Sequence, residues 1–316
     1  MVFIQPADPS SADVSSSAIT LWLAEKMNLH QREVPVTNVR KYQRPSSVAE
    51  AWSLLNKGGK SAMLVAGGVD VALFTPPAVE TLIDLALIPL KSIESRTEGL
   101  AIGSGVTLTE LLESRLSAAC FGGILQTTLK QVASPLLRNM ATVGGSLASS
   151  HPWSDVITLF LALDAQVKQY CGQVQTTSLA RLLEERGMLS RAIITEVVLP
   201  VQTEHTYACF EKFARTGFDV AMLNCACRVK ISEGCCDDVR IAFGGMPSIG
   251  HRMEAVESAL NGAKLDHATI EAVAEIAGKA IPARDDIRAS EDYRRILASA
   301  GVRRCLTRIA QRAYGM

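Results

Sequence analysis

Two glycine pairs, each preceded by apolar residues, constrain this chain more than any other feature. The first is Gly67–Gly68 within Leu64–Val71, and the second is Gly144–Gly145 within Ala141–Ala148. Glycine allows a positive φ, and it lets main-chain N–H groups approach an anion with no Cβ in the way. We therefore predict that these two turns, far apart in the sequence, meet in space and hold one diphosphate between them. A dinucleotide that carries a flavin would meet that need.

The bulk composition excludes several classes of protein. The 316 residues allow two domains of ordinary size, and 32 basic residues balance 32 acidic ones. A net charge of zero argues against broad electrostatic binding of nucleic acid or of an anionic membrane. The apolar runs are too short or too interrupted for a membrane span. Eight cysteines without framework spacing, and an N-terminus unlike a signal peptide, favour a cytoplasmic location.

The pattern of apolar residues predicts an α+β chain in three parts. Residues 1–34 are expected to form an N-terminal extension and residues 35–201 a two-lobed α/β domain. Residues 202–316 are expected to form a C-terminal α+β domain with an antiparallel sheet and helices. A short amphipathic helix is predicted at Ala18–Met27. Packing on its own domain, docking onto a partner subunit and disorder remain open for that helix.

Local signals predict individual elements. Ser47 is expected to cap a helix, with Glu50 three residues later completing a capping box. Thr109 is expected to cap a helix over Thr107–Leu116, and Asp155 to begin or cap the helix after the second glycine pair. Further helices are expected at Ile124–Val132, Met253–Leu260, His267–Ala277 and Glu291–Tyr314, and strands at Ala62–Ala66, Thr81–Leu85, Gln166–Tyr170, Ile193–Leu199, Ala208–Lys212, Ala221–Val229 and Val239–Phe243.

Together these motifs resemble the FAD-binding subunit of molybdenum hydroxylases, the family of xanthine dehydrogenase, carbon monoxide dehydrogenase and nicotinate dehydrogenase. The resemblance runs from about Val34 to Ile309. It is carried by Tyr42–Pro45, Leu64–Ala72, Ile102–Leu108, Arg138–Asp155, Phe210–Ala221, Arg240–Arg252 and Arg288–Arg294. It implies a two-lobed FAD-binding domain of the vanillyl-alcohol-oxidase (PCMH) type, followed by a domain of the CO dehydrogenase flavoprotein type.

The resemblance also implies which residues hold FAD, bound without a covalent link. The two glycine turns would form the pyrophosphate loops, and Asp155 would contact the ribityl chain of the flavin. Ala133 would lie near the ring or the adenine end, and Ile194 near the isoalloxazine ring. The residues implied are Leu64, Val65, Ala66, Gly67, Gly68, Val69, Asp70, Val71, Ala133, Thr142, Gly144, Gly145, Ser146, Asp155 and Ile194. No side chain is expected to be catalytic.

Three positions depart from the family pattern. Val69 stands where Thr or His is usual, Ser146 where Asn or Asp is usual, and Met222 where some relatives have Lys. Each lost neutral hydrogen bond costs about 0.5–1.5 kcal/mol. Serine can still form a hydrogen bond and the backbone donors remain, so FAD binding is still predicted, and whether the three departures weaken it stays open.

Cysteines and arginines of the C-terminal part are expected to be structural. Cys225 and Cys227 share one face of a strand, as buried cysteines do, and typical metal ligands are separated by a turn. No metal site is therefore expected. The arginines of the final helix are expected to form a solvated or inter-subunit face.

The function implied by the resemblance is that of an electron-transfer flavoprotein subunit. Its expected partners are an iron–sulfur subunit and a molybdopterin subunit, with NAD or another compound as electron acceptor. Two alternatives stay open at this point. One is a free-standing FAD-dependent oxidoreductase, and the other is a non-catalytic relative with weakened FAD binding.

Overall fold

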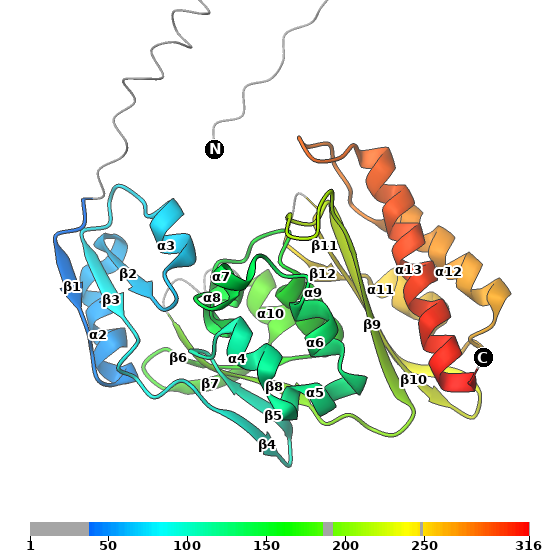
Figure 1. Ribbon diagram of the computed structural model, residues 1–316, viewed down its shortest axis with the longest axis horizontal. Helices are drawn as coiled ribbons and strands as arrows, with labels where there is room; N and C mark the ends of the chain where they lie inside the picture. Colours follow the sequence, from blue (N-terminus) through cyan, green and yellow to red (C-terminus); the bar gives the residue numbers. More distant parts are fainter. Residues whose placement is uncertain (1–37, 186–191, 247–248, 316) are drawn as a thin grey trace, which may run out of the picture.

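The computed structural model describes residues 38–185, 192–246 and 249–315 and arranges them around three β-sheets (Figure 1). The N-terminal extension, with the helix predicted at Ala18–Met27, lies outside the described residues. The three sheets follow one another along the chain, so the molecule has a first lobe, a central lobe and a C-terminal α+β part.

The first lobe is a small parallel sheet in the order β1-β3-β2, with helices beside it. Its elements are β1 (Lys41–Gln43), α2 (Val48–Gly58), β2 (Ala62–Val65), α3 (Val69–Phe74) and β3 (Thr81–Asp84). The predicted cap of α2 at Ser47 is confirmed, but the capping box is incomplete, because the Glu50 carboxylate bonds the residue before the cap. The Glu50 N–H donates to Ser47 Oγ (3.2 Å), and the Glu50 carboxylate accepts from the Ser46 N–H (2.9 Å). Helix α2 ends at Gly58, and the next residue, Gly59, is its C-cap with φ +54°.

The central lobe is a five-stranded antiparallel sheet in the order β4-β5-β8-β6-β7, and short helices lie over one of its faces (Figure 1). The strands are β4 (Ile93–Arg96), β5 (Gly99–Gly103), β6 (Gln166–Tyr170), β7 (Val174–Ser178) and β8 (Ile193–Pro200). The helices are α4 (Leu108–Glu113), α5 (Arg115–Ala119), α6 (Ile124–Leu129), α7 (Pro135–Arg138), α8 (Val143–Ala148), α9 (Asp155–Ala162) and α10 (Leu179–Glu184).

Several predictions for this lobe are wrong in detail. The N-cap of α4 is Thr107, whose hydroxyl accepts from the Glu110 N–H (3.1 Å), whereas the Thr109 hydroxyl bonds Asn139 (2.7 Å). The predicted helix Thr107–Leu116 breaks at Ser114, which has ψ 130°. Strand β7 was not predicted, because its polar residues hide the period of two, and the short helix α10 was not predicted either.

The C-terminal part contains an antiparallel sheet, as predicted, and its strand order is β12-β11-β10-β9. Its elements are β9 (Thr206–Phe213), β10 (Leu223–Ser232), β11 (Cys235–Gly244), β12 (His251–Arg252), α11 (Glu254–Leu260), α12 (His267–Ala280) and α13 (Glu291–Tyr314). The sheet is covered on both faces. Ala226 packs into the core of the central lobe around α9, while Cys225 and Cys227 pack with residues of α13. Strand β10 is therefore buried on both sides.

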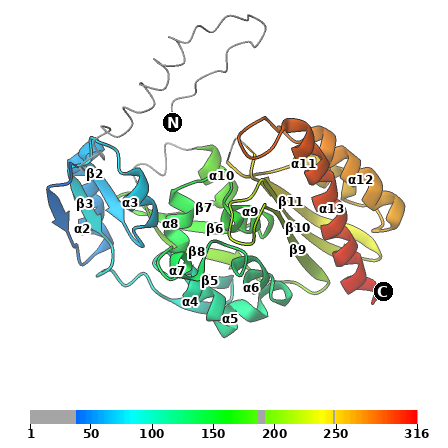
Figure 2. The same cartoon turned by 45° about the horizontal axis from the view of Figure 1, so that its top comes forward.

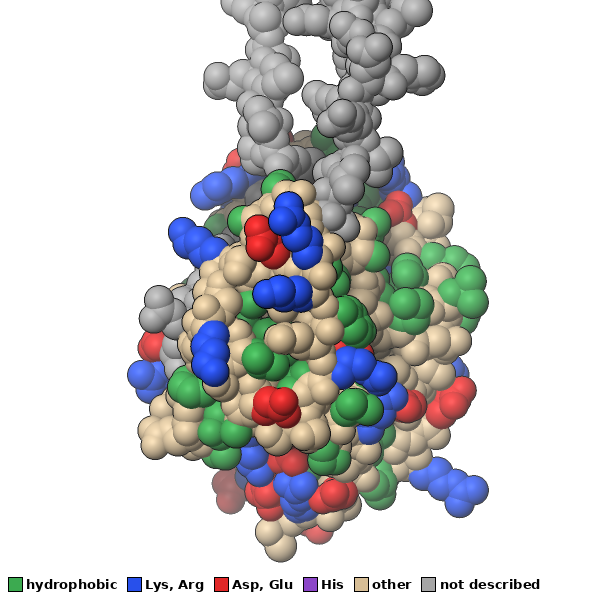
Figure 3. Space-filling model, turned by 90° about the vertical axis from the view of Figure 1, so that its left-hand side faces the viewer, with side chains coloured by type: hydrophobic (Ala, Val, Ile, Leu, Met, Phe, Trp, Pro, Cys, Tyr) green, Lys and Arg blue, Asp and Glu red, His purple; other side chains and the backbone are tan. Residues whose placement is uncertain are grey.

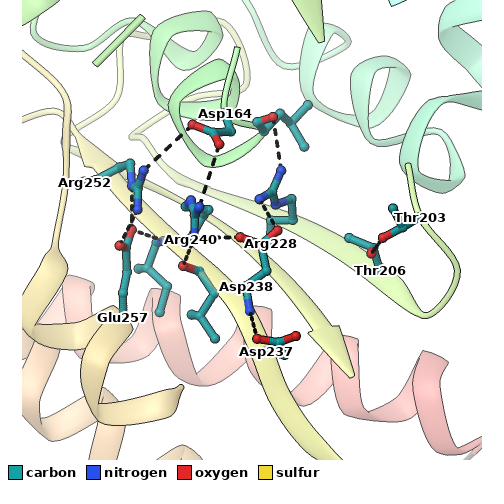
Figure 4. A network of polar contacts seen from close by, with 12 residues as sticks. Asp164, Thr203, Thr206, Arg228, Asp237, Asp238, Arg240, Arg252 and Glu257 are labelled. Carbon is teal, nitrogen blue, oxygen red and sulfur yellow. Dashed lines mark hydrogen bonds and ion pairs between the residues drawn. The ribbon is translucent and has the colours of Figure 1, made fainter. Parts of the chain in front are cut away.

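An arginine–carboxylate network joins the C-terminal sheet to the central lobe at the end of α9 (Figure 4). Arg240 and Arg252 each lie 3.8 Å from Asp164, and the Arg228 guanidinium donates to the Leu163 carbonyl (3.4 Å). Cations at a helix C-terminus interact favourably with the negative end of the helix dipole. Asp238 lies 2.6 Å from Arg228 and Glu257 lies 2.7 Å from Arg252, so three arginines face three carboxylates and the network is close to neutral.

On the face of the molecule formed mainly by the first lobe, charges of one sign do not gather into a patch. Figure 3 shows basic, acidic and hydrophobic side chains interspersed there. Among the described residues, no helix combines the length and the apolar character that a bilayer crossing requires.

Candidate functional site

The two glycine turns lie side by side, as the sequence predicts. A Cβ on Gly67 would lie 1.7 Å from the Met140 carbonyl oxygen, so only glycine allows this approach. The Asp70 carboxylate of the first turn lies 2.9 Å from His151 Nε2, just beyond the second. Figure 2 shows α3 beside α8, the two short helices that carry these turns. Residues far apart in the sequence thus form one site.

The first turn presents a run of free main-chain donors. Gly68 is left-handed, with φ +74°, and it begins α3. None of the N–H groups of residues 67–71 has a hydrogen-bond acceptor among the described residues. Such a run of N–H groups, with no Cβ on two of its residues, fits a diphosphate oxygen. Of the predicted site residues, Leu64 and Val65 lie in β2 immediately before this run.

The second glycine pair is not a loop, contrary to the expected conformation. Gly144 and Gly145 lie within α8, and neither has a positive φ. Their N–H groups donate inside the protein: Gly144 to the Ser104 carbonyl (2.8 Å) and Gly145 to Thr142 Oγ1 (3.0 Å). A Cβ on Gly144 would lie 2.6 Å from the Ser104 Cβ, so this glycine permits close packing. The Ser146 hydroxyl donates to the Thr142 carbonyl (2.9 Å).

The Asp70 carboxylate, which links the two glycine segments, is ionised and is hydrogen-bonded to His151. Hydrogen bonding from His151 lowers the pKa of the Asp70 carboxyl, and the Ser149 hydroxyl adds to the effect, against the opposing cost of burial. Asp70 therefore places a negative charge at the turn that offers the free amides. Since a diphosphate is also negative, this charge opposes its binding.

Asp155 lies in a buried polar network. Its carboxylate accepts from Lys212 Nζ (2.8 Å) and from Asn224 Nδ2 (2.6 Å), and only 5% of the residue is exposed. Burial raises the pKa of the Asp155 carboxyl, while Lys212 and Asn224 oppose that shift. Helix α9 begins at Asp155, as one form of the prediction had it, and its N-cap is Ser154, so the alternative that Asp155 is the cap is wrong. Its contact with the ribityl chain stays a prediction.

Sequence reasoning missed Lys212 and Asn224. Lys212 also donates to the Gln131 carbonyl (2.8 Å), and Asn224 is fully buried and accepts from the Thr158 hydroxyl (2.8 Å). The available signal was polarity inside apolar strands, because a lysine or asparagine there needs a partner. The absence of lysine at Met222 is thus accompanied by a different buried cation close to Asp155.

The other two predicted site residues have different surroundings. Ala133 has φ +44°, and its carbonyl and that of Val132 each accept from Arg138 Nη1 at 2.7 Å. Arg138 thus bonds main-chain carbonyls and holds this strained turn in place. Ile194 lies in β8, and its side chain is 7% exposed within the core of the central lobe. The neighbouring Thr195 carbonyl accepts from the Ser104 N–H (3.0 Å).

An aromatic stack continues the site toward the C-terminal part. The His151 and Trp153 rings are parallel within 10°, with centroids 4.8 Å apart, and the Phe74 ring meets His151 edge-on at 5.9 Å. The Arg288 guanidinium lies 4.8 Å over Trp153. Trp153 and Arg288 were not predicted as site residues.

One arginine of the final helix belongs to this region rather than to a solvated face. Arg294 is fully buried and donates to the Met222 carbonyl (3.0 Å) and to Asp286 (2.6 Å). The prediction of a solvated or inter-subunit face is wrong for this residue, because its guanidinium satisfies carbonyls of the loop before α13.

Comparisons with known proteins agree with this geometry. Residues 36–202 match the family described as the FAD binding domain in molybdopterin dehydrogenase, and residues 208–309 match the CO dehydrogenase flavoprotein C-terminal domain. The chain is 29% identical to the carbon monoxide dehydrogenase medium chain of Hydrogenophaga pseudoflava, over 84% of this chain and 95% of that one. It is 25% identical to the xanthine dehydrogenase FAD-binding subunit of Escherichia coli O157:H7, over 87% and 97%.

Solved structures give the same result. A carbon monoxide dehydrogenase from Hydrogenophaga pseudoflava superposes with a TM-score of 0.78 at 27% identity, covering 85% of this chain and 96% of that one. Quinoline 2-oxidoreductase from Pseudomonas putida 86 gives 0.77 at 27% identity, covering 86% and 97%. With the two adjoining glycine segments and the free amides of the first, these matches identify the chain as a member of the FAD-binding medium-subunit family of molybdenum hydroxylases.

Proposed function

We propose that this chain works as the electron-transfer flavoprotein subunit of a molybdenum hydroxylase complex, between an iron–sulfur subunit and an acceptor such as NAD. The observation that carries the proposal is the convergence of the two glycine turns, with free amides along residues 67–71. The relatives are medium chains or FAD-binding subunits, which supports separate iron–sulfur and molybdopterin chains as partners. The cytoplasmic location expected from the sequence belongs to the same proposal.

The protein's own contribution would be binding and orientation. Bound FAD would supply the redox chemistry, as cofactors do. The amides of residues 67–71 would hold the diphosphate, the domain boundary near residue 202 would separate the FAD-binding domain from the C-terminal domain, and the Asp155–Lys212 pair would present a fixed polar group to the ribityl side. No described side chain is required as a general acid or base.

Two measurements test this proposal. The apoprotein is titrated with FAD, and flavin fluorescence is expected to be quenched at one equivalent. The chain is then produced together with an iron–sulfur chain and a molybdopterin chain, and substrate is expected to bleach the flavin only when all three are present. Bleaching of the isolated chain by a small alcohol or amine would instead establish a free-standing oxidoreductase.

A second candidate function is favoured by the composition of the first turn. Val69 offers no side-chain hydrogen bond, Asp70 adds a negative charge, and the Gly144 and Gly145 amides are already bonded inside the protein. These features support a relative with weakened FAD binding that serves in assembly. Such a chain would purify colourless, take up no FAD at excess, and still copurify with a molybdopterin chain.

A further inference from the structure

Four cysteines from three separate elements converge in the core of the C-terminal part. Cys209 lies on β9, Cys225 and Cys227 on β10, and Cys305 on α13. In the strand register Cys227 is directly opposite Cys209, and Cys225 shares the same face of β10. Cys225, Cys227 and Cys305 are fully buried, and Cys209 is 3% exposed.

The thiols are close enough to share one ion. The sulfur atoms of Cys225, Cys227 and Cys305 all lie within 4.8 Å of one another, and those of Cys225 and Cys227 are 3.8 Å apart. Cys209 lies opposite Cys227 in the strand register but outside this group of three, so its thiol would have to turn toward the others to act as the fourth ligand. In a tetrahedral zinc site the zinc–sulfur distance is about 2.3 Å, so neighbouring sulfurs are about 3.8 Å apart.

The backbone is adapted to this meeting of α13 with the sheet. Gly301 lies one turn before Cys305, and a Cβ there would be only 3.1 Å from the Cys225 Cβ. Glycine at this position therefore lets the helix approach β10 closely enough for Cys305 to reach the strand cysteines. The spacing of Cys225 and Cys227 argues against a metal site formed by these two residues alone, because no turn separates them. The structure adds possible ligands from β9 and α13, so the two strand cysteines need not form the site by themselves.

Positively charged side chains lie on the Cys209 side of the four-cysteine group, where they would favour thiolates. Arg308 contacts Cys209 and Glu211, and Arg304 lies 3.5 Å from Glu211, so two cations face one carboxylate there.

We propose that Cys209, Cys225, Cys227 and Cys305 form a structural zinc site that ties β9 and β10 to α13. Zn²⁺ replaces four thiol protons, which pass to solvent, and the resulting tetrathiolate complex carries two negative charges. An all-sulfur set of four ligands selects a thiophilic ion of this kind, and no open position is left for catalysis. Because the group is buried, the ion binds while the domain folds. This site is independent of FAD binding.

The test uses the full chain, produced and refolded with Zn²⁺ and then freed of loosely bound metal. Elemental analysis is expected to find one zinc per chain. When the wild-type chain is loaded with Co²⁺ instead, it is expected to show the strong visible absorption of a tetrahedral cobalt–thiolate site. This measurement requires no variant. Cys305→Ser and Cys227→Ser are expected to lose the metal and the cobalt spectrum, and acid is expected to release the ion because protons compete for the thiolates.

Cys236→Ser is the matched control. Cys236 is also buried in this sheet, at 1% exposure, but its thiol is not part of the group. The control should keep one zinc per chain. The proposal is overturned if the wild-type chain folded with zinc retains none and gives no tetrahedral cobalt spectrum. It is equally overturned if Cys305→Ser and Cys227→Ser keep as much zinc as Cys236→Ser does.

Discussion

The two glycine pairs use the same residue for different purposes. At the first pair, Gly68 takes a left-handed conformation, and the amides of residues 67–71 are free. At the second, Gly144 and Gly145 are helical, and their amides bond Ser104 and Thr142. The first turn thus leaves main-chain donors unpaired among the described residues, whereas the second brings α8 against the adjoining Ser104 segment.

This difference assigns separate roles to the two halves of the site. The first turn has unsatisfied donors, which a ligand can satisfy. The second supplies the wall against which the first turn packs, because the Met140 carbonyl lies where a Gly67 Cβ would be. Substitutions in the first turn should therefore change cofactor affinity, whereas those in the second should change stability.

Gly67→Ala is expected to have the largest effect. Its Cβ would lie 1.7 Å from the Met140 carbonyl oxygen, so the turns must separate. Overpacking of this severity costs about 3 kcal/mol, which corresponds to about a 100-fold loss of FAD affinity in fluorescence titration. Gly217→Ala, with nothing within 4 Å of the new Cβ, is the control and should bind FAD like the wild type. Unchanged affinity in Gly67→Ala would break the comparison.

Gly144→Ala should lower stability rather than affinity. The new Cβ would lie 2.6 Å from the Ser104 Cβ, which forces α8 away from its neighbour. We expect a loss of about 2 kcal/mol in the free energy of unfolding, measured by denaturant titration. FAD affinity of the folded variant should stay within a few-fold of the wild type. If affinity fell while stability held, the second pair would be a ligand-binding turn after all.

Gly68→Ala should have a smaller effect, because its Cβ meets nothing within 4 Å and only the φ of +74° is unfavourable. A left-handed non-glycine residue costs about 1 kcal/mol, which predicts about a five-fold loss of FAD affinity. Gly68→Asn is the matched variant, since asparagine tolerates this conformation better. Equal losses in both variants would show that the Cβ itself, and not the backbone, is the obstacle.

Asp70→Asn is expected to have the smallest effect, in the opposite direction. Removing a solvent-screened charge several ångströms from a diphosphate gains about 0.5 kcal/mol, or about two-fold tighter FAD binding. Because the pKa of Asp70 is lowered in the folded chain, its ionised form stabilises the fold above the unfolded pKa of about 4. That contribution is lost as the pH falls through the folded pKa.

Thermal melts of the wild type and Asp70→Asn without FAD check the sign. The wild type should be the more stable of the two near neutral pH, and the difference should shrink below about pH 4. A difference that grew in acid would mean that Asp70 is not held as a carboxylate by His151.

Much of the fold follows from local signals. The helix cap at Ser47, the helix Glu291–Tyr314 and the strands before residue 246 all depend on residues within a few positions of one another. The predicted cap of α4 is wrong because Thr107 and Thr109 are both residues that cap helices. The signal that separates them is the glutamate three residues after Thr107, which Thr109 lacks. Local signals also missed α8, since glycines disfavour helices.

The site was less predictable than the fold. That two turns meet could be expected from their spacing and the family resemblance, but the use of each amide could not. Asp155 was expected to face the cofactor, yet its partners Lys212 and Asn224 come from two strands of the other domain. A buried carboxylate needs partners, but its own neighbours in the sequence do not tell which residues supply them.

The sequence by itself determined the family, the order of the elements and the positions of the glycine turns, because periodicity, caps and motif spacing act along the chain. The tertiary structure decided which amides stay free, which groups hold Asp155 and that Cys305 meets Cys225 and Cys227. The physical reason is that these contacts join segments far apart in the chain, and their distances are fixed only when helices and sheets pack against one another.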